Sequence, residues 1–359
     1  MLSAFGLGCP SLRNHYILNL ISKLLDSIPY ICCMIITKTP FRISFVGGGS
    51  DLEAFYSQHP GAVLSTSINQ YMYISSHKYF DEDQIRVKYS QTETIKNISD
   101  LKHPILKAVL DKFKLNGIEI SSIADIPGGT GMGSSSSFTV GLLHNLYTFI
   151  GKEVSKKELA EEACNIEINL LKEPIGKQDQ YAAAYGGMNV IRFEKNGNTL
   201  VESVKVSNEL VKELEGNLLM FYLGTQRKSS DILTEQQKNT SSADKTQTLI
   251  KMVSLVDDLK IALEAGYLNE MGKILDENWI LKQQLASTIT NTEINECYDT
   301  ALKNGALGGK LLGAGGGGFM LFYCDQENQP RLIKSLNKLR RFDFSFENQG
   351  SSVIYEEKN

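Results

Sequence analysis

Short runs in which apolar and polar residues alternate recur between residues 34 and 206, and this pattern predicts β-strands with one face buried. Turn-forming residues separate the runs, as in Glu194-Lys-Asn-Gly-Asn198, which indicates a hairpin. The predicted strands cover residues 35–46, 62–74, 84–89, 118–123, 188–193 and 201–206.

Two helical patterns interrupt this series of strands. In the first, apolar residues recur at the spacing of one helix face from Phe138 to Ile150. The second helix is predicted to begin at Ser155, because Ser155 and Glu158 have the spacing of a capping box, and to stop at Pro174. Its inward face would hold Leu159, Ala163, Ile166 and Leu170.

The second half of the chain starts with an apolar run that predicts a fully buried strand. This strand, three helices and a last strand are expected near residues 218–223, 249–264, 268–286, 292–304 and 319–323. Residues 1–33 lack such regularity and are set apart as an N-terminal appendage. Lys23, Asp26 and Pro29 leave their apolar stretch too short to span a bilayer.

The composition is that of an ordinary globular protein with room for two cores, since 42% of the 359 residues are hydrophobic and 22% are charged. The net charge of −4 does not favour nucleic acid or an acidic membrane as a partner. The six cysteines show neither zinc-site spacings nor a disulfide framework, which indicates free thiols in a reducing cytoplasm.

A glycine-rich stretch leads directly into the first helical pattern, reading Pro-Gly-Gly-Thr-Gly-Met-Gly-Ser-Ser-Ser-Ser-Phe over residues 127–138. Unpaired N–H groups and the helix dipole attract anions at a helix start, and glycine lets an anion come close, so this stretch predicts a phosphate site. Ser134 and Ser135 stand where a Walker A loop needs Lys and Ser/Thr, which excludes an ordinary P-loop. The alternative is a tight turn that feeds a serine-capped helix.

A second glycine run, Gly313-Ala-Gly-Gly-Gly-Gly318, has the spacing of a dinucleotide-binding fingerprint. That fingerprint requires a helix after the glycines, whereas a strand pattern follows here. We therefore expect the run to serve a close backbone approach to another loop or to a ligand.

Together with Thr39-Pro-Phe-Arg-Ile-Ser-Phe-Val-Gly-Gly-Gly-Ser-Asp51, the two glycine runs form three motifs in order. In order, content and spacing they resemble the GHMP family of small-molecule kinases, over residues 34–359. The resemblance implies an α+β fold with an ATP-binding N-terminal domain at 34–205, like domain 2 of ribosomal protein S5, and a ferredoxin-like C-terminal domain at 206–359. It also implies ATP as cofactor, with phosphorylation in the cleft between the domains.

The resemblance assigns the nucleotide phosphates to backbone and hydroxyl groups of the first glycine stretch, namely Gly129, Gly131, Met132, Gly133, Ser134, Ser135 and Ser136. It further implies Mg²⁺, bound by Ser135, with Ser134 as the second choice, and by the carboxylate of Glu167. Oxygen ligands shared with substrate phosphates suit this ion. From the residues alone, Glu167 would be a solvent-facing helix residue.

Asp179, in Gly176-Lys-Gln-Asp-Gln-Tyr181, resembles the family's catalytic aspartate, which would orient the acceptor hydroxyl and accept its proton. Arg42 occupies the arginine position of the first motif in the sugar-kinase branch. Its permanent charge would hold Asp179 ionised and stabilise the transferring phosphoryl group. Taken alone, either residue is more typical of a surface ion pair.

The resemblance places the sugar beside the first motif, with Asp51 as a ligand of its hydroxyl groups and Gly48, Gly49 and Ser50 next to it. Taken alone, Asp51 would be an aspartate that caps a turn. Galactokinases carry a Glu-His pair at the positions of Gly48 and Gly49, so a bulkier or differently substituted sugar is expected. Two glycines of the third motif are further candidates for the substrate side, Gly315 and Gly316.

Within the family, the first motif and Pro174-Ile-Gly-Lys-Gln-Asp-Gln-Tyr181 most resemble kinases of D-glycero-α-D-manno-heptose 7-phosphate. These enzymes phosphorylate the anomeric C1 hydroxyl to give the 1,7-bisphosphate for nucleotide-activated heptose synthesis. A substrate with its own phosphate needs cationic contacts, for which Arg227 comes first, then Lys228 and Lys177. Each of these three is equally typical of a solvated surface.

Two other functions stay open. One is another sugar 1-kinase, such as an L-fucose kinase, and the other is a catalytically silent protein that binds sugar and ATP as a regulator. The second is disfavoured because Arg42, Glu167 and Asp179 are all present, whereas a pure binder needs neither a base nor a metal carboxylate. The expected partner is a small-molecule sugar phosphate, and a homodimer is left open.

Overall fold

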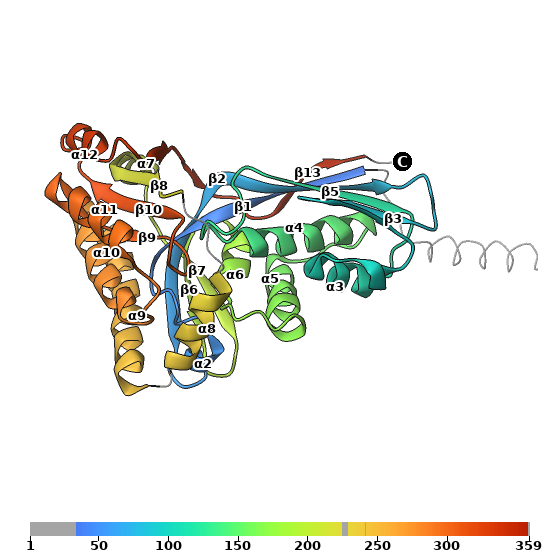
Figure 1. Cartoon of the computed structure of the whole chain (residues 1–359), viewed down its shortest axis with the longest axis horizontal. Coiled ribbons are helices and arrows are strands. Elements are labelled where there is room, and N and C mark those ends of the chain that lie inside the picture. The colour runs from blue at the N-terminus through green and yellow to red at the C-terminus, as the bar shows by residue number, and fades with distance from the viewer. Residues whose placement is uncertain (1–33, 225–228, 241, 358–359) are drawn as a thin grey trace, which may run out of the picture.

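The computed structural model describes residues 34–224, 229–240 and 242–357, and the elements keep the labels of Figure 1. The strands are β1 (Met34–Val46), β2 (Gly61–Lys78), β3 (Ile85–Lys88), β4 (Thr92–Ile95), β5 (Ile118–Ala124), β6 (Met188–Phe193), β7 (Thr199–Ser203), β8 (Leu218–Tyr222), β9 (Ala306–Leu311), β10 (Phe319–Cys324), β11 (Arg340–Phe342), β12 (Phe346–Glu347) and β13 (Ser352–Glu356). The α-helices are α2 (Glu53–Tyr56), α3 (Pro104–Phe113), α4 (Ser134–Phe149), α5 (Lys156–Cys164), α6 (Gln178–Tyr185), α7 (Asn208–Asn217), α8 (Ser229–Asn239), α9 (Ala243–Glu264), α10 (Leu268–Gln283), α11 (Thr292–Lys303) and α12 (Gln329–Ser335).

The first sheet, sheet A, is organised around the long strand β2. Its first half pairs with β6 and its second half with β5, while β1 runs antiparallel to it over nearly the whole length. The strand order is β13-β1-β2-β5-β3-β4, with β6, β7 and β12 beside this path, and the β3–β5 pair is parallel. Helices α3 to α6 lie on one face of the sheet (Figure 1), where α4 packs against β1 and β2.

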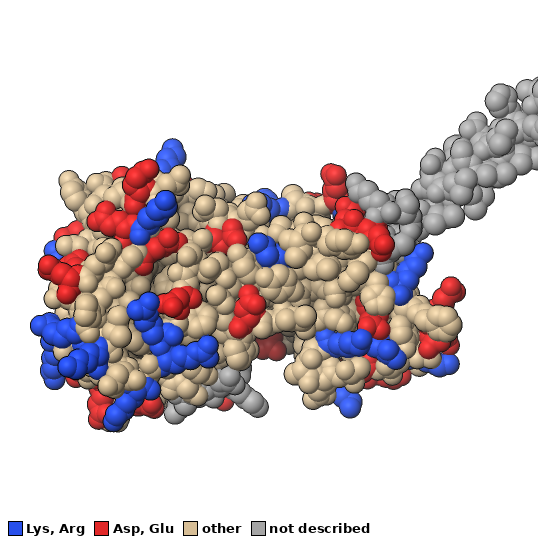
Figure 2. Space-filling view, turned by 90° about the horizontal axis from the view of Figure 1, so that it is seen from above, with Lys and Arg blue, Asp and Glu red and all other residues tan. Residues whose placement is uncertain are grey.

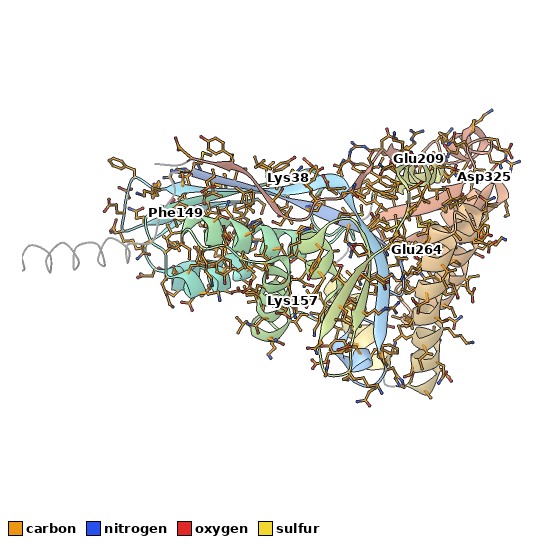
Figure 3. All side chains as sticks on the ribbon, turned by 180° about the vertical axis from the view of Figure 1, so that it is seen from behind. Lys38, Phe149, Lys157, Glu209, Glu264 and Asp325 are labelled. Atoms are coloured by element: carbon orange, nitrogen blue, oxygen red, sulfur yellow. The ribbon has the colours of Figure 1, made fainter. Side chains whose placement is uncertain are left out.

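The second sheet, sheet B, contains four antiparallel strands in the order β11-β8-β10-β9. Helices α9, α10 and α11 stand together on this side of the molecule (Figure 1), and the core there includes Trp279, Phe221 and Phe322. Seen from behind, Phe149 at the end of α4 and Asp325 after β10 mark the two ends of the molecule (Figure 3). The two layered parts meet where α9 packs against β1 and β2 and where α10 packs against β1.

The predicted strands are confirmed, with boundaries shifted by a few residues, and the second glycine run does enter a strand, β10. The predicted capping box is confirmed as well, because the Ser155 hydroxyl accepts from the Glu158 N–H and the Glu158 carboxylate accepts from the Ser155 N–H. The helices α2, α3, α6, α7, α8 and α12 were not predicted.

One helical prediction is wrong at its end. The helix that starts at Lys156 changes into a π-helical turn at Asn165–Leu170 and stops before it reaches Pro174. Leu159, Ala163 and Ile166 are buried as expected, but Leu170 is 60% exposed. The extra residue in a π-turn rotates everything after it about the helix axis, so a stripe with 3.6-residue spacing no longer follows one face.

The end of the chain returns to sheet A. Strand β13 pairs with β1 and β12 pairs with β2, and the Ser351 hydroxyl bonds to Thr39 of β1 at 2.8 Å and to His144 of α4 at 3.0 Å. The division into 34–205 and 206–359 stays a prediction, and the last two strands lie with the first part.

In the described ranges no helix has the length and hydrophobicity to cross a membrane. Acidic and basic side chains are interspersed on the face shown in Figure 2.

Candidate active site

The first glycine stretch forms a loop at the start of α4. Gly129, Gly131 and Gly133 have φ values of +76°, +83° and +75°, a region that disfavours residues with a Cβ. Gly133 is the N-cap, and no side chain caps the helix there, so the alternative of a serine-capped helix is wrong. The first N–H groups of α4 are therefore left for other acceptors.

The second glycine run packs against this loop. A Cβ on Gly313 would lie 2.4 Å from the Gly131 Cα, and one on Gly318 would lie 2.4 Å from the Thr130 carbonyl oxygen. The expected close approach to another loop is confirmed, and it explains why glycines are needed on both sides. Gly315 and Gly316 contact Ile289 instead and do not line the cavity described below.

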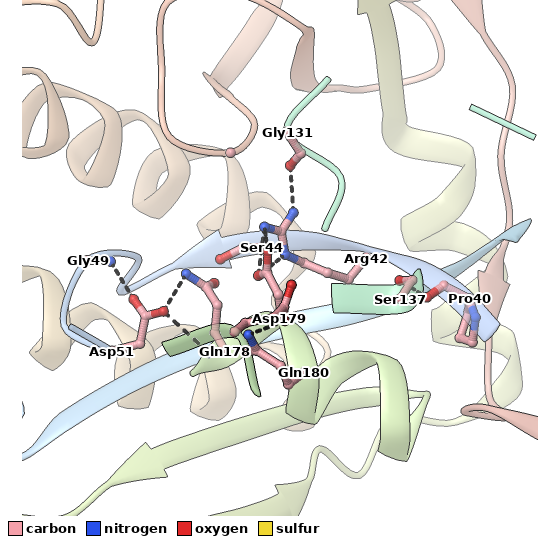
Figure 4. Close-up of polar contacts among 12 residues, drawn as sticks. Pro40, Arg42, Ser44, Gly49, Asp51, Gly131, Ser137, Gln178, Asp179 and Gln180 are labelled. Atoms are coloured by element: carbon pink, nitrogen blue, oxygen red, sulfur yellow. Dashed lines mark hydrogen bonds and ion pairs between the residues drawn. The ribbon is translucent and has the colours of Figure 1, made fainter. Parts of the chain in front are cut away.

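Arg42 and Asp179 form an ion pair at the centre of the site (Figure 4). The Arg42 Nε and Nη2 atoms donate to the two Asp179 carboxylate oxygens, each at 2.7 Å, and Nη1 donates to the Gly131 carbonyl oxygen at 2.6 Å. Arg42 projects from β1, and Asp179 lies in the first turn of α6. Since the Arg42 side chain is 6% exposed and that of Asp179 is 23% exposed, the carboxylate keeps access to the cavity.

Asp51 lies on the other side of the same cavity, in the loop after β1 (Figure 4). One carboxylate oxygen accepts from the Gly49 N–H at 3.0 Å, and the other accepts from the Gln178 side chain at 3.1 Å. Burial, and secondly the charge of Asp179, raises the pKa of Asp51. Ser50 does not face the cavity, because its hydroxyl donates to the Gly47 and Ala62 carbonyl oxygens.

The cavity between the two sheets is lined by polar groups that lack partners within the protein. In the described residues, the Ser44 hydroxyl, the Gln178 amide oxygen and the Gln236 amide nitrogen are buried without a hydrogen bond. Buried donors and acceptors of this kind are expected to meet ligand groups. The lining is Arg42, Ser44, Gly48, Gly49, Asp51, Leu52, Ile175, Gly176, Gln178, Asp179, Leu233, Gln236, Lys282, Lys310, Gly313 and Ala314.

Among the lining residues with polar side chains, the sequence did not predict Ser44, Gln178, Gln236, Lys282 and Lys310. The strand pattern could have indicated Ser44, because residues 42 and 44 of one strand share a face. Lys282 carried a signal too, since it follows Trp279 by three residues on a helix and so falls on the buried stripe. Gln236 had no local signal, because its place depends on how α8 closes over Gly49.

Ser135 and Glu167 are in contact at the start of α4. The Ser135 hydroxyl donates to one Glu167 oxygen at 2.8 Å, and the Gln180 amide donates to the other at 2.7 Å. The π-turn carries Glu167 inward, where it is 0% exposed, so the solvent-facing alternative is wrong. Burial raises the pKa of Glu167, against the hydrogen bonds from Ser135 and Gln180.

This donor set fits Mg²⁺, because it consists of a hydroxyl and a buried carboxylate beside the glycine loop, and Mg²⁺ takes few protein oxygens together with phosphate oxygens. The described residues contain no cluster of three or more metal-binding side chains, which is the arrangement of a metal held by protein alone. The burial cost of the Glu167 charge would fall with a cation beside it.

A second pocket adjoins the glycine loop, and Asp179 is not part of its lining. It is lined by Gly129, Ser134 and Ser135 together with Tyr89, His103 and Phe138. The His103 ring lies 4.8 Å from that of Tyr89 and 5.1 Å from that of Phe138. An apolar, aromatic pocket next to a phosphate loop suits the base of a nucleotide.

The candidates for the substrate's own phosphate are not gathered in the cavity. Lys177 lines a neighbouring pocket that shares Asp51 with the cavity, and its ammonium donates to the Gly197 carbonyl oxygen and lies over the Tyr56 ring. Arg227 and Lys228 lie outside the described residues.

Comparison with known proteins defines the class of this site. The models of the GHMP kinase N-terminal and C-terminal domains match residues 100–187 and 259–340. The D-glycero-alpha-D-manno-heptose 7-phosphate kinase of Campylobacter jejuni is 30% identical over 333 residues, which are 88% of this chain and 97% of that protein. The chain belongs to the GHMP kinase family, and it is a phosphotransferase that uses ATP.

Solved structures agree on the fold. A D-glycero-D-manno-heptose 1-phosphate kinase from Bacteroides thetaiotaomicron has a TM-score of 0.74 at 24% identity and covers 89% of this chain and 99% of its own. The Lactococcus lactis galactokinase complexed with galactose has a TM-score of 0.71 at 16% identity, covering 94% and 100%. The predicted α+β fold, with an N-terminal domain like domain 2 of ribosomal protein S5 and a ferredoxin-like C-terminal domain, is confirmed.

Proposed function

We propose that this enzyme transfers the γ-phosphoryl group of ATP to the anomeric C1 hydroxyl of D-glycero-D-manno-heptose 7-phosphate. The product is the 1,7-bisphosphate, for nucleotide-activated heptose and surface polysaccharide synthesis. The observation that carries the proposal is the Arg42–Asp179 pair, which stands where the glycine loop meets a cavity with unpaired donors and acceptors. The similarity to the Campylobacter jejuni heptose 7-phosphate kinase supports this acceptor.

Asp179 is proposed as the base of the reaction. Its oxygens keep lone pairs beyond the two bonds from Arg42, and so a sugar hydroxyl in the cavity can donate to them. As the bond from the hydroxyl oxygen to phosphorus forms, the hydroxyl proton passes to the carboxylate. Arg42 orients the carboxylate and offers positive charge to the phosphoryl group.

The glycine loop and α4 are proposed to bind the nucleotide, with its phosphates at Gly129, Gly131, Met132, Gly133, Ser134, Ser135 and Ser136. The pocket with Tyr89, His103 and Phe138 would take the base. Ser135 and Glu167 would hold Mg²⁺, which neutralises phosphate charge when bound.

The sugar is proposed to lie between Asp51 and Asp179, beside Gly48 and Gly49. Asp51 and the unpaired groups of Ser44, Gln178 and Gln236 offer both donors and acceptors to a polyhydroxylated ligand. Its 7-phosphate would reach beyond Asp51, toward Lys177 in the neighbouring pocket, and Arg227 remains a candidate for the same phosphate. A cytoplasmic location agrees with the need for ATP.

The test is turnover of ATP with a panel of sugars and sugar phosphates, with NMR identification of the phosphorylated position. We expect ADP release that depends on heptose 7-phosphate and gives phosphate at C1. Asp179→Asn keeps the size and shape of the side chain but cannot accept the proton, so kcat should fall by about 100-fold or more while ATP still binds.

The panel also separates the alternatives. Preferred turnover of L-fucose would make the protein a fucose kinase, and turnover of heptose 1-phosphate would place the existing phosphate at the other position. Tight binding of ATP and sugar without ADP release would show a regulator. The structural relative from Bacteroides thetaiotaomicron is described as a 1-phosphate kinase, which makes the second comparison worthwhile.

A further inference from the structure

Lys282 is a charged residue on the buried face of α10. Met271, Leu275 and Trp279 on the same face are fully buried, and Lys282 itself is 5% exposed. Lysine is almost never buried unless its charge is paired or used, because removal of an ammonium from water is costly. Its aliphatic part extends this apolar stripe, and its ammonium reaches the wall of the active-site cavity.

The protein satisfies the Lys282 ammonium only in part. Within the described ranges its Nζ atom donates to one acceptor, the Gly313 carbonyl oxygen, and it forms no ion pair. An ammonium has three N–H donors, so two of them remain for ligand atoms. Among the described residues that line the cavity, no other cationic side chain is buried with only one hydrogen-bond acceptor.

Lys310 provides a contrast within the same cavity. It is 1% exposed, and its Nζ atom donates to the Ser44 carbonyl oxygen at 2.7 Å and to the Phe45 carbonyl oxygen at 2.8 Å. These acceptors belong to β1, whereas Lys310 belongs to β9, so this lysine joins the two sheets. Its ammonium has a structural task, which the Lys282 ammonium does not share.

The contacts of Gly313 place the Lys282 ammonium next to the glycine loop. Gly313, its acceptor, touches Gly131, and the Gly131 carbonyl oxygen accepts from Arg42 Nη1. Burial and then the charge of Arg42 lower the pKa of Lys282 to about 8, while Asp51 and Asp179 act in the opposite direction. The influence of Arg42 from β1 and of Asp179 from α6 agrees with a Lys282 ammonium that faces both elements across the cavity.

We propose that Lys282 is a second catalytic cation, which binds an oxygen of the phosphoryl group while that group passes from ATP to the acceptor. Arg42 approaches from β1, and Lys282 approaches from α10 on the opposite wall. In this step the acceptor oxygen gives its proton to Asp179 and bonds to the γ-phosphorus. The bond from that phosphorus to the β–γ bridging oxygen breaks, and ADP leaves with the electron pair.

The position favours the transferring group over the phosphate that the sugar already carries. The acceptor hydroxyl must lie at Asp179, and in heptose 7-phosphate the existing phosphate is at the far end of the molecule from C1. The anion nearest to Arg42, Asp179 and the glycine loop is therefore the one in transfer. The inference rests on the proposed kinase reaction, but it holds for any acceptor that the enzyme phosphorylates.

The test compares Lys282→Met with Lys273→Met, which changes an exposed lysine of the same helix whose partner is Glu270. For Lys282→Met we expect kcat to fall by about 100-fold or more, as for the loss of one donor to a transition-state charge. The KM for the sugar phosphate and the Kd for ADP should stay within about threefold, whereas binding of ADP with aluminium fluoride should weaken strongly. Lys273→Met should match the wild type in all four.

Lys282→Gln keeps more of the length and polarity, and it should show the same split if the methionine variant is poorly folded. A kcat within about threefold of wild type in both variants would overturn the proposal. A raised KM for the sugar phosphate at unchanged kcat would overturn it as well, and would assign Lys282 to the sugar's own phosphate. If wild type uses another sugar, the proposed substrate is wrong, yet the same comparison with that sugar still tests Lys282.

Discussion

Buried charge distinguishes the single residues of this site. As whole residues, the five charged groups Arg42, Asp51, Glu167, Lys282 and Lys310 are each no more than 5% exposed. One contact with a carboxylate or carbonyl rarely offsets the cost of such burial. Arg42 has its ion pair and Lys310 has two carbonyl acceptors. Burial is the main cause of the shifted pKa values of Asp51, Glu167, Lys282 and also Lys310. Such shifts are typical of groups that complete their surroundings with a ligand.

Lys282 permits a prediction about stability and pH. Its pKa is lowered from 10.5 to about 8 in the folded protein, so the charged form destabilises the fold below pH 8, by about 3 kcal/mol from the size of that shift. Between pH 8 and 10.5 the folded protein releases the proton while the unfolded chain keeps it, and stability rises with pH. Lys282→Met removes this penalty and should raise the free energy of unfolding at pH 7.

The measurement is urea unfolding of the wild type and Lys282→Met, without ligand, from pH 7 to pH 10. The advantage of the variant should shrink as pH rises through 8, with Arg42, Asp51, Asp179 and Lys310 unchanged in both proteins. An advantage that stays constant with pH would mean that packing, rather than the buried charge, causes it. A variant that is less stable at pH 7 would contradict the burial penalty itself.

At the scale of elements, two glycine loops from different parts of the chain pack backbone to backbone. Gly131 carries the contact, because a Cβ there would lie 2.6 Å from the Leu312 carbonyl oxygen and its φ is +83°. This contact positions the two carbonyl oxygens that hold Arg42 and Lys282, those of Gly131 and Gly313. The start of α4 and the strand β10 are thereby joined at the site.

Gly131→Ala should separate these loops. We expect the free energy of unfolding to fall by about 1–3 kcal/mol, because of both the left-handed backbone and the clash, and kcat to fall by at least about tenfold. Gly128→Ala is the control for stability, since its Cβ would meet only the Ser134 hydroxyl at 3.8 Å. Equal unfolding energies for the two variants would show that the contact does not stabilise the fold.

At the scale of the whole molecule, the last strands close the first sheet. Beyond the pairing of β13 with β1, Gly350 approaches the backbone of Ala184 so closely that its Cβ would lie 2.1 Å from the carbonyl oxygen. The first part of the chain therefore depends on a segment that follows the second part. Such an arrangement couples the folding of both parts, because neither β1 nor α6 is fully covered until the end of the chain arrives.

Ending the chain after Phe344 would remove β12 and β13. We expect the shortened protein to lose thermal stability and to aggregate, because Ile35–Lys38 lose their partner strand and β1 becomes an unpaired edge of sheet A. Removal of residues 357–359 alone, which keeps all four residues of β13 that pair with β1, is the comparison. Soluble expression with an unchanged melting temperature after the longer truncation would contradict this role of the C-terminal strands.

Much of the fold was predictable because its signals are local. Alternation along β1, β2 and β6 predicted strands, the Ser155–Glu158 pair predicted a helix start, and the strand after residue 318 excluded a dinucleotide fold. Helix α6 was not predicted because it is short and contains three consecutive alanines, which produce no apolar stripe. The π-turn was not predicted because one extra residue in a turn is not visible in the spacing of the apolar residues.

From the sequence alone come the order of the predicted strands and helices, the glycine loop at the start of a helix and, through the resemblance of three motifs, the kinase class with Arg42, Asp179 and Glu167 as candidates. Which side chains meet in the cavity depends on the tertiary structure. Ser44, Gln236, Lys282 and Lys310 come from four separate elements, and their proximity depends on the packing of two sheets. Local patterns report the burial of a face, whereas a site is made by long-range contacts between faces, which no local pattern contains.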